Sequence, residues 1–483
     1  MTSMTTIETS VAVIGAGIAG AWLAYRLAKR GIAVLVVSAD GEDHTPCVSR
    51  QWAAAVLHRR LVEELEASIA AAFADVSGTQ HPELQGTVRR YLPRESAELS
   101  GLVEFMPFEF ARIPRHVVPA PRLGAGSEVI ATVLARMSAL GGRAVSGRVT
   151  HLHVVDDACG GLQFTRDGEI HTVRSEAVVL AAGGFSGLFA DAATANTGAI
   201  LGMFAGCGGR LANLEFFYRF ALGDLTRRRV LYPPDLKGSR LYRDGERAAW
   251  LETAHERYPR EQLDLAVFRE YWTRNFGVPH VAELTAGTVE LGPIRGFSMG
   301  GAAHTRGATN VRGIYAVGEA RHDLAADCIV GLPWASYLAS AGELCDVLAE
   351  RCGSSGPCDV AARAVPPPLD PALRDAVKER LAAFQDHRFG ERAAASFVTW
   401  CREARVAVQR AGHEDGEDFG LLVLAEAFAA SALARRESRG FFFRGDRPDA
   451  APGGARRITC AVHDPAAARI DVELVEETNL PAI

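Results

Sequence analysis

The chain has 483 residues, with 52 Lys and Arg against 58 Asp and Glu, which gives a formal net charge of −6. This small negative charge argues against nucleic acid and anionic membrane surfaces as partners, and no apolar run approaches the ~20 residues that span a bilayer. The length exceeds one ordinary hydrophobic core, so we expect two or three domains.

Cysteine usage and the first residues bear on the compartment. The nine cysteines are dispersed without a CxxC pair. This argues against a disulfide framework and a thiolate-held metal centre, and it suits a reducing cytosol. MTSMTTIETS lacks a basic region followed by an apolar core, so no secretory signal is expected. We therefore predict a cytoplasmic protein.

The first elements in chain order form a βαβ unit. An apolar run, TSVAVI, is followed by a glycine turn, a helix (AWLAYRLAKR) and a second buried strand, IAVLVV. Gly15, Gly17 and Gly20 form GxGxxG between the strand and the helix. The first glycine allows a tight turn, the second lets a pyrophosphate approach the backbone, and the third lets helix and strand pack closely. In this context the pattern predicts a dinucleotide site at the helix N-terminus.

The end of the second strand argues against a plain NAD site. The residue that binds ribose there is usually acidic, but this chain has Ser38, with Asp40 two residues further on. A hydroxyl group can still bind ribose, so Ser38 is a predicted contact.

The rest of the chain divides by composition. Residues 127–140 predict an amphipathic helix capped by Ser127, and a meander of strands follows. The segment 221–290 is rich in Arg, Tyr, Asp and Pro, and we interpret it as a cap inserted between two core segments. Beyond a linker, amphipathic helices are predicted at 371–388, 392–410 and 418–438, followed by a terminal hairpin.

Three strand ends far apart in the sequence carry glycines. VVLAAGG ends at Gly183–Gly184, FSMGG at Gly300–Gly301, and GIYAVGEA has Gly318–Glu319 after its strand. Glycines at strand ends let a flat ring or a phosphate chain lie against the backbone. A carboxylate after such a turn can accept hydrogen bonds from sugar-alcohol hydroxyls.

In combination these motifs resemble the flavoprotein family of L-aspartate oxidase and of the succinate dehydrogenase and fumarate reductase flavoprotein subunits. The resemblance covers nearly the whole chain and includes VIGAGIAG, VVLAAGG, TGAILGMFAGCGGRLANLEF, FSMGG, NVRGIYAVGEA and RRESRGFFFRGDRP. It implies FAD rather than NAD. It also implies an α/β fold, in which a Rossmann-like FAD-binding domain carries an inserted α+β capping domain and a C-terminal three-helix domain. The expected boundaries are 1–220 and 291–353 for the FAD-binding domain, 221–290 for the cap, and 354–483 for the C-terminal domain.

The resemblance also implies which residues hold FAD. The ADP half would contact the GxGxxG glycines, Ser38 and the backbone of Val149, and Glu319 would bind the ribityl chain. The full set of expected FAD-binding residues is Gly15, Gly17, Gly20, Ser38, Ser49, Val149, Ala182, Gly183, Gly300, Gly301, Gly318, Glu319 and Ser336. Where the family has a covalent flavin attachment, it uses a histidine. This chain has Ser49 near that position, so dissociable FAD is expected.

The substrate motifs depart from the family. The family clamps four-carbon dicarboxylates with two histidines and an arginine. Phe220 and Gly296 stand at the histidine positions, and Trp334 stands near the arginine position. Losing charge-assisted hydrogen bonds of ~1.5–3 kcal/mol each argues against succinate, fumarate or aspartate as the natural substrate. Arg219 or Arg295 is an alternative partner for one carboxylate, and Tyr218 is a further candidate contact.

Two residues are candidates for catalysis. Arg260, in YPREQ, stands at the position of the family's cap arginine, which serves as acid/base. A surface arginine is the alternative interpretation. His322 follows the GEA turn and is a candidate general base, although a lone loop histidine is often a bystander.

We therefore expect an FAD-dependent oxidoreductase that removes hydride from a C–N or C–C bond of an amino or carboxylic acid other than a simple four-carbon dicarboxylate. O2 or an electron carrier would be the acceptor, and specialised metabolism is one setting. The alternatives are an L-aspartate oxidase with a rebuilt clamp, a fumarate-reductase-like enzyme fed by a carrier, and a non-catalytic flavoprotein interaction module.

Overall fold

The computed structural model describes most of the chain, and the account below is confined to that part. The described ranges are 4–39, 94, 97–98, 101–102, 109–113, 116–120, 125–231, 233–257, 260–322, 332–352, 360–413, 416–451, 457–464 and 469–476. The predicted FAD contact Ser49 lies outside these residues. None of the described helices combines the length and the apolar character needed to cross a bilayer.

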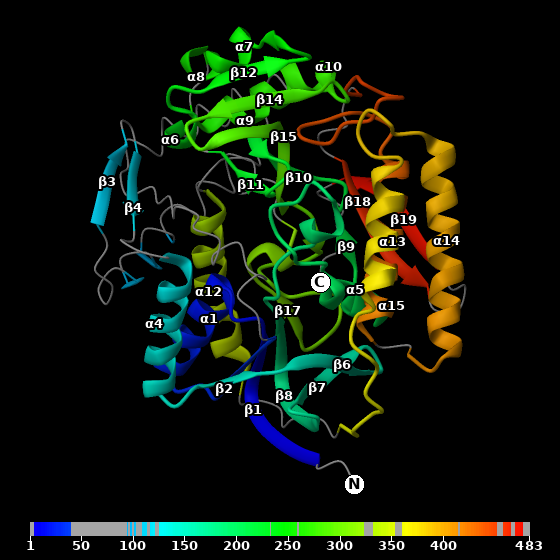
Figure 1. Cartoon of the computed structure of the whole chain (residues 1–483). Coiled ribbons are helices and arrows are strands. Elements are labelled where there is room, and N and C mark those ends of the chain that lie inside the picture. Colours follow the sequence, from blue (N-terminus) through cyan, green and yellow to red (C-terminus); the bar gives the residue numbers. More distant parts are fainter. Residues whose placement is uncertain are drawn as a thin grey trace.

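A seven-stranded sheet forms the core of the N-terminal half (Figure 1). Its strand order is β5 (Arg143–Ser146), β2 (Val34–Ser38), β1 (Met4–Ile14), β8 (Glu169–Leu180), β7 (Ala158–Arg166) and β6 (Arg148–Val155), with β17 (Ile314–Ala316) also paired to β8. The strands β5, β2, β1, β8 and β17 run parallel, whereas β6, β7 and β8 form the antiparallel meander that the sequence predicts.

Both faces of this sheet are covered, which explains why its strands are apolar runs. Val11 and Val13 pack in one cluster with α1 (Ile18–Lys29), α4 (Ala125–Ala139) and α12 (Leu332–Arg351). Ala12 and Ile14 pack on the opposite face, in a second and larger cluster. The predicted helix at 127–140 is therefore α4, but it begins at Ala125. Ser127 lies within its first turn instead of at the cap, a shift within the usual uncertainty of helix ends.

A second, antiparallel sheet belongs mostly to the segment predicted as the cap (Figure 1). Its strand order is β11 (Arg229–Val230), β10 (Phe217–Asp224), β15 (Gly287–Ser298), β14 (His280–Leu284), β12 (Arg240–Arg243) and β13 (Glu246–Arg247). Short helical elements cover it: α6 (Pro233–Leu236), α7 (Ala249–Glu252), α8 (Ala254–Arg257), α9 (Arg260–Val267), the π-helical turn η2 (Phe268–Trp272) and α10 (Thr273–Asn275). The expected boundaries at 221 and 290 fall inside β10 and β15, so two hydrogen-bonded strands connect this segment to the core.

The C-terminal region packs against the core through helix and strand contacts. The three predicted helices are α13 (Pro371–Ala382), α14 (Glu391–Arg410) and α15 (Glu417–Ala434), and the predicted hairpin is β18 (Arg457–Asp464) with β19 (Arg469–Glu476). The hairpin extends a small sheet that also holds β9 (Leu211–Ala212) and β16 (Gly301–Ala302). Helix α15 is buried on all sides and crosses α5 (Ala199–Gly206) where Gly420 meets Gly202. The remaining described elements are β3 (Glu109–Ile113), β4 (His116–Ala120), η1 (Ser186–Leu188) and η3 (Gly318–Ala320).

Candidate functional site

The GxGxxG turn joins β1 to α1 at the carboxyl edge of the parallel strands. Gly15 has a φ of +108°, and a Cβ atom there would lie closer than 3.0 Å to the carbonyl oxygen of Ala181. A Cβ atom at Gly20 would collide with the carbonyl oxygen of Gly15 in the same way. Gly17 is the N-cap of α1, so no side chain caps the first N–H groups of the helix. The turn therefore has the shape and the N–H donors that a pyrophosphate requires.

Two other predicted contacts flank this turn. Ser38 ends β2, and its carbonyl oxygen accepts a hydrogen bond from Gly147 N at 2.8 Å. Val149 follows two residues later in β6, where it pairs with Phe164 next to a register shift. Val149 thus lies two residues beyond the backbone hydrogen bond that joins Gly147 to Ser38 at the end of β2.

Glu319 sits at the centre of three strand ends. It lies in η3, directly after β17, and is 8% exposed. Its carboxylate accepts hydrogen bonds from Ser298 N at 2.9 Å and from Ser298 Oγ at 3.3 Å, and it also bonds the backbone of Gly184. A Cβ atom at Gly184 would lie closer than 3.0 Å to both Ser298 Oγ and Glu319. The glycine at 184 is thus required because the carboxylate and the hydroxyl occupy the space beside it.

The Ala182–Gly183 turn is held by a side chain that sequence analysis did not single out. Asn196 Nδ2 donates to the carbonyl oxygen of Ala182 at 2.6 Å, and its Oδ1 accepts from Gly198 N at 3.1 Å. A Cβ atom at Gly183, whose φ is +77°, would meet the Asn196 amide. The Asn-Thr-Gly sequence is a turn signal that would have identified Asn196 as a candidate.

The second glycine pair packs between two other motifs. A Cβ atom at Gly300 would lie closer than 3.0 Å to the carbonyl oxygen of Asn213, in the NLEF motif. One at Gly301 would be as close to the carbonyl oxygen of Ala320, in the GEA turn. The structure therefore brings together Gly300, Gly301, Gly318 and Glu319, although their motifs are far apart in the sequence.

His322 and Ser336 lie near this junction. The backbone N–H of His322 donates to Ala302 O at 3.1 Å, and its ring lies 5.8 Å from that of His304. The buried guanidinium of Arg321 donates to Ser336 Oγ at 3.3 Å. These contacts place both predicted residues beside the glycine pair, and they assign no catalytic role to His322.

Glu319 makes the FAD-free protein sensitive to pH. Burial raises the pKa of Glu319 to about 7, although hydrogen bonds from Ser298 and Gly184 favour the ionised form. Because this pKa lies above the unfolded value, the protonated form favours the folded state. That contribution is complete below pH 4.5 and is lost as the pH rises through 7, at a total cost of about 3 kcal/mol. Unfolding of the FAD-free protein by urea between pH 5 and 8 should therefore show a steeper loss of stability than in a Glu319→Gln variant. Equal slopes would contradict the prediction.

Aromatic side chains occupy the positions where the family resemblance places the carboxylate clamp. Tyr218 stacks on Phe297 at 4.7 Å between ring centroids and contacts Phe220 at 5.0 Å. The Phe220 ring lies directly over Gly296, where a Cβ atom would come closer than 3.0 Å to it. All four residues are buried. We call Tyr218, Phe220, Gly296 and Phe297 the aromatic wall. The two positions where the family has clamp histidines are thus coupled, because the Phe220 ring fills the space that a side chain at position 296 would need.

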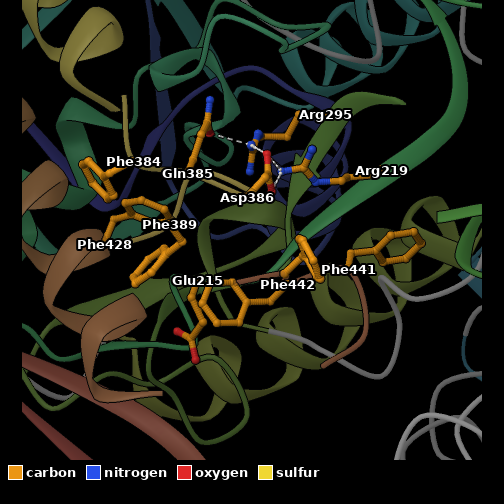
Figure 2. A pocket seen from close by; sticks show the side chains of 11 residues that line it. Glu215, Arg219, Arg295, Phe384, Gln385, Asp386, Phe389, Phe428, Phe441 and Phe442 are labelled. Carbon is orange, nitrogen blue, oxygen red and sulfur yellow. Dashed lines mark hydrogen bonds and ion pairs between the residues drawn. The ribbon is translucent and has the colours of Figure 1, made fainter. Parts of the chain in front are cut away.

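Arg219 and Arg295 are engaged with the carboxylates of Asp191 and Asp386, of which Figure 2 shows Asp386. They stand opposite each other on β10 and β15 and are 2% and 4% exposed. Arg219 Nη2 donates to Asp386 at 2.7 Å and its Nη1 to Asp191 at 3.2 Å, while Arg295 Nε donates to Asp191 at 3.1 Å. Burial pushes the pKa of Asp191 up, but Arg295 and Arg219 outweigh it and hold the pKa below its ordinary value. Asp191 and Asp386 already neutralise both arginines, which argues against the expectation that one of them holds a substrate carboxylate. In addition, Tyr218 and Arg219 are successive strand residues and point to opposite sides.

A small cavity lies beside this ionic cluster (Figure 2). Its volume is about 20 Å³, which is enough for about one water molecule and too small for an amino acid. The lining residues are Glu215, Arg219, Arg295, Phe384, Gln385, Asp386, Phe389, Phe428, Phe441, Phe442 and Phe443. We therefore do not assign the substrate to this cavity.

Arg260 is the first residue of α9, and Trp334 lies in the first turn of α12. The side chains of both lie outside the described part of the structure. The position of α9 is nevertheless fixed one helical turn further on. Asp264 accepts hydrogen bonds from Tyr218 Oη and from Ala221 N, both at 2.7 Å. Asp264 therefore ties the helix that begins with Arg260 to the aromatic wall. Sequence analysis missed it because nothing local distinguishes it from the other acidic residues.

Two protein-family models match most of the chain. The FAD binding domain model matches residues 10–275, and the fumarate reductase flavoprotein C-terminal model matches residues 414–482. The L-aspartate oxidase of Caulobacter vibrioides is 28% identical over 371 residues, which cover 69% of this chain and 70% of that protein. The L-aspartate oxidase of Rhodospirillum rubrum is 30% identical over 191 residues, 35% of this chain and 62% of that protein.

Solved structures share the fold at low sequence identity. A quinol–fumarate reductase with menaquinol molecules superposes with a TM-score of 0.78 at 18% identity, covering 99% of this chain and 100% of that one. The E. coli quinol fumarate reductase gives 0.72 at 17% identity, covering 98% and 97%. These likenesses concern the fold alone.

The fold and the glycine turns around Glu319 define an FAD-dependent oxidoreductase. The chain belongs to the flavoprotein family of L-aspartate oxidase, succinate dehydrogenase and fumarate reductase. The described residues fit FAD, because the glycine turn leaves the first N–H groups of α1 uncapped by a side chain and the buried Glu319 carboxylate lies where the ends of β8, β15 and β17 meet. Among these described residues, no group of His, Cys, Asp and Glu is arranged to hold a metal ion.

Proposed function

We propose that this enzyme oxidises an amino or carboxylic acid that is bulkier and more apolar than a four-carbon dicarboxylate. The observation that carries the proposal is the aromatic wall. Phe220, Gly296 and Phe297 offer no charged donor to a carboxylate, whereas their apolar surface favours an aromatic or branched group.

In the proposed mechanism the cofactor and the protein side chains have different roles. When bound, FAD supplies the hydride acceptor. Residues 221–290 act as the cap over the substrate, and the aromatic wall orients its apolar body and excludes water. Arg260 stays protonated, as arginine does near neutral pH, and steadies negative charge or passes a proton at the reacting carbon. The hydrogen bonds of Asp264 to Tyr218 and Ala221 support this role, since they fix the helix that Arg260 begins.

The electron acceptor and the location are parts of the same proposal. O2 is the favoured acceptor and the cytoplasm the favoured compartment. The similarity to two L-aspartate oxidases keeps L-aspartate as a second candidate substrate, with a clamp rebuilt from other residues.

Anaerobic mixing with candidate acids tests this function. The oxidised protein is mixed with L-aspartate, and separately with L-phenylalanine and L-leucine, while the visible flavin absorption is followed. We expect bleaching by a bulky acid and none by L-aspartate in a protein that dithionite can still reduce. Rapid bleaching by L-aspartate alone would replace the proposal with the second candidate. If only an external carrier reduces the flavin, the enzyme works as a carrier-fed reductase. If no donor reduces it, the chain is a non-catalytic module.

Arg260 can be tested in the same assay. Arg260→Ala should slow flavin reduction by at least about 100-fold, the size of effect seen when one charge-stabilising donor is removed. Arg257→Ala is the matched control, because Arg257 is exposed and lies against Trp250 in the same segment. Full activity in the Arg260 variant would disprove the assigned role.

We also propose that FAD is held without a covalent bond. Acid precipitation should release all of the yellow colour into the supernatant, because Ser49 stands near the position of the family's attachment histidine. A coloured pellet would indicate a covalent link.

A further inference from the structure

One arginine at the junction between the cap and the C-terminal region forms no ion pair with a described residue. Arg269 lies in the π-helical turn η2, a geometry that is rare and often found at functional sites. Its side chain is partly buried, and its Nη1 atom is buried without a hydrogen-bond partner in the described part of the chain. A buried guanidinium nitrogen without a partner is costly, so it calls for an explanation.

Glu437, a buried acidic residue whose charge acts on Arg269, already accepts a full set of hydrogen bonds. Residues 435–451, which follow α15, form a loop that we call the arginine loop. Within it, Glu437 Oε1 accepts from Arg435 Nη1 at 3.2 Å and Arg439 Nε at 3.1 Å. Its Oε2 accepts from Arg439 Nη2 at 2.8 Å and from Ala451 N at 2.6 Å. With four donors on its two oxygens, Glu437 has no hydrogen bond left for Arg269.

Other arginines occupy the buried carboxylates of this junction. Arg435 pairs with Glu215 and with Glu437, and Arg439 pairs with Glu437, so neither of these two carboxylates pairs with Arg269. Burial lowers the pKa of Arg269, and Arg439 lowers it further, whereas the charges of Asp449 and Glu437 raise it. An anion bound here would relieve both the desolvation and the repulsion between Arg269 and Arg439.

A continuous run of aromatic rings connects the aromatic wall to this arginine. Tyr218 lies 4.9 Å from Phe441, and Phe441 lies 5.6 Å from Phe268, measured between ring centroids. Phe268 directly precedes Arg269. Packed aromatic rings therefore join the aromatic wall to the turn that carries Arg269.

We propose that Arg269 binds the carboxylate of the substrate at the junction between the cap and the arginine loop. This inference rests on the proposed function and assigns its carboxylate recognition to a residue outside the family-like motifs. The ligand is an aromatic or branched monocarboxylate, or the corresponding amino acid. Arg269 is a binding residue here and takes no part in hydride or proton transfer.

The probe is sodium phenylacetate, with sodium chloride at the same ionic strength as the salt control. Its affinity for the FAD-containing protein is measured from the rise in melting temperature with concentration. Arg269→Met should weaken binding by about 10- to 100-fold, the loss expected for one charge-assisted hydrogen bond. Arg274→Met is the matched control, because Arg274 is an exposed arginine five residues further along the same segment. We expect wild-type affinity in that variant.

A second measurement separates binding from structure. Without ligand, Arg269→Met should melt at or above the wild-type temperature, because it removes a partly desolvated charge without a partner. If Arg269→Met does not fold, Arg269→Gln serves in its place. Unchanged affinity for phenylacetate in either variant, or a large loss of stability in both, overturns the inference.

Failure of the Arg269 inference can be distinguished from failure of the proposed function. Phenylacetate that competes with the bleaching acid supports a substrate carboxylate at Arg269, whereas stabilisation without competition overturns that assignment. If an acid bleaches the flavin of the wild type and of the Arg269 variant with the same half-saturating concentration, the role of Arg269 is overturned and the proposed function stands. Arg269-dependent binding of phenylacetate in a protein that no acid bleaches supports the anion site and overturns the proposed chemistry.

Discussion

Replacing Asp386 with alanine is expected to lower the free energy of unfolding by about 3–5 kcal/mol, the usual cost of removing one partner of a buried ion pair. Both oxygens of Asp386 accept from Arg219 Nη2, at 2.7 and 2.9 Å, and Arg295 lies 3.7 Å away. Without Asp386, two nearly fully buried guanidinium groups would share the single carboxylate of Asp191. The effect should be large because Asp386 joins the C-terminal region to β10 and β15, the strands that connect the cap to the core.

The turn at Asp386 requires a second variant. Its φ of 55° is tolerated by Asp and Asn better than by Ala, so alanine adds backbone strain. Asp386→Asn keeps the turn and removes the charge, so it should show most of the decrease in the free energy of unfolding expected for Asp386→Ala. Asp375→Ala is the control, because Asp375 pairs with Arg374 on the exposed surface, where ion pairs contribute at most ~1 kcal/mol. Urea unfolding, followed by far-ultraviolet circular dichroism, measures the free energy of unfolding of all three variants. Equal stability of the Asp386 and Asp375 variants would show that the cluster is not stabilising.

Replacing Gly184 with alanine is expected to lower the affinity for FAD by at least about tenfold. The added Cβ atom would lie closer than 3.0 Å to Ser298 Oγ and to Glu319, so both groups must move away from the strand ends. Displacing the Glu319 carboxylate would lose at least one charge-assisted hydrogen bond to the cofactor, or ~1.5–3 kcal/mol. Gly184 does not have a positive φ, so the effect would be steric and not a matter of backbone strain.

The measurement is the dissociation constant of FAD, from quenching of its fluorescence on binding to FAD-free protein. Gly390→Ala is the matched control, since the nearest atom to a Cβ at Gly390 is 4.0 Å away. A Gly184 variant that retains stoichiometric, tightly bound FAD after purification would mean that Glu319 does not contact the cofactor as expected.

Local sequence patterns predicted the parts of the fold that depend on neighbouring residues. The βαβ unit with Gly15, the meander, the three C-terminal helices and the terminal hairpin are all present. Their signals are hydrophobic periodicity and glycine positions, which act over a few residues. The glycine motifs also predicted a dinucleotide site, because close backbone approach leaves few alternatives to glycine, and their resemblance to the flavoprotein family implied FAD.

The partners of charged residues could not be predicted in this way. In the sequence, Arg219 and Arg295 are arginines beside substrate motifs. Nothing in the sequence predicts that Arg219 forms a hydrogen bond with Asp386, which lies 167 residues further along the chain. Asp264 was missed for the same reason, since its contacts exist only once β10 and α9 are packed together. Asn196 differs, because its local turn signal was present in the sequence.

The sequence by itself therefore determined the fold class, the family and the cofactor, since these depend on short motifs whose backbone geometry admits few residue types. Only the tertiary structure decided which arginines carry free charge. It paired Arg219 and Arg295 with Asp191 and Asp386, whereas Nη1 of Arg269 is buried without a hydrogen bond to any described residue. The physical reason is that an arginine's charge is available to a ligand only where folding brings no carboxylate to it, and that depends on long-range packing.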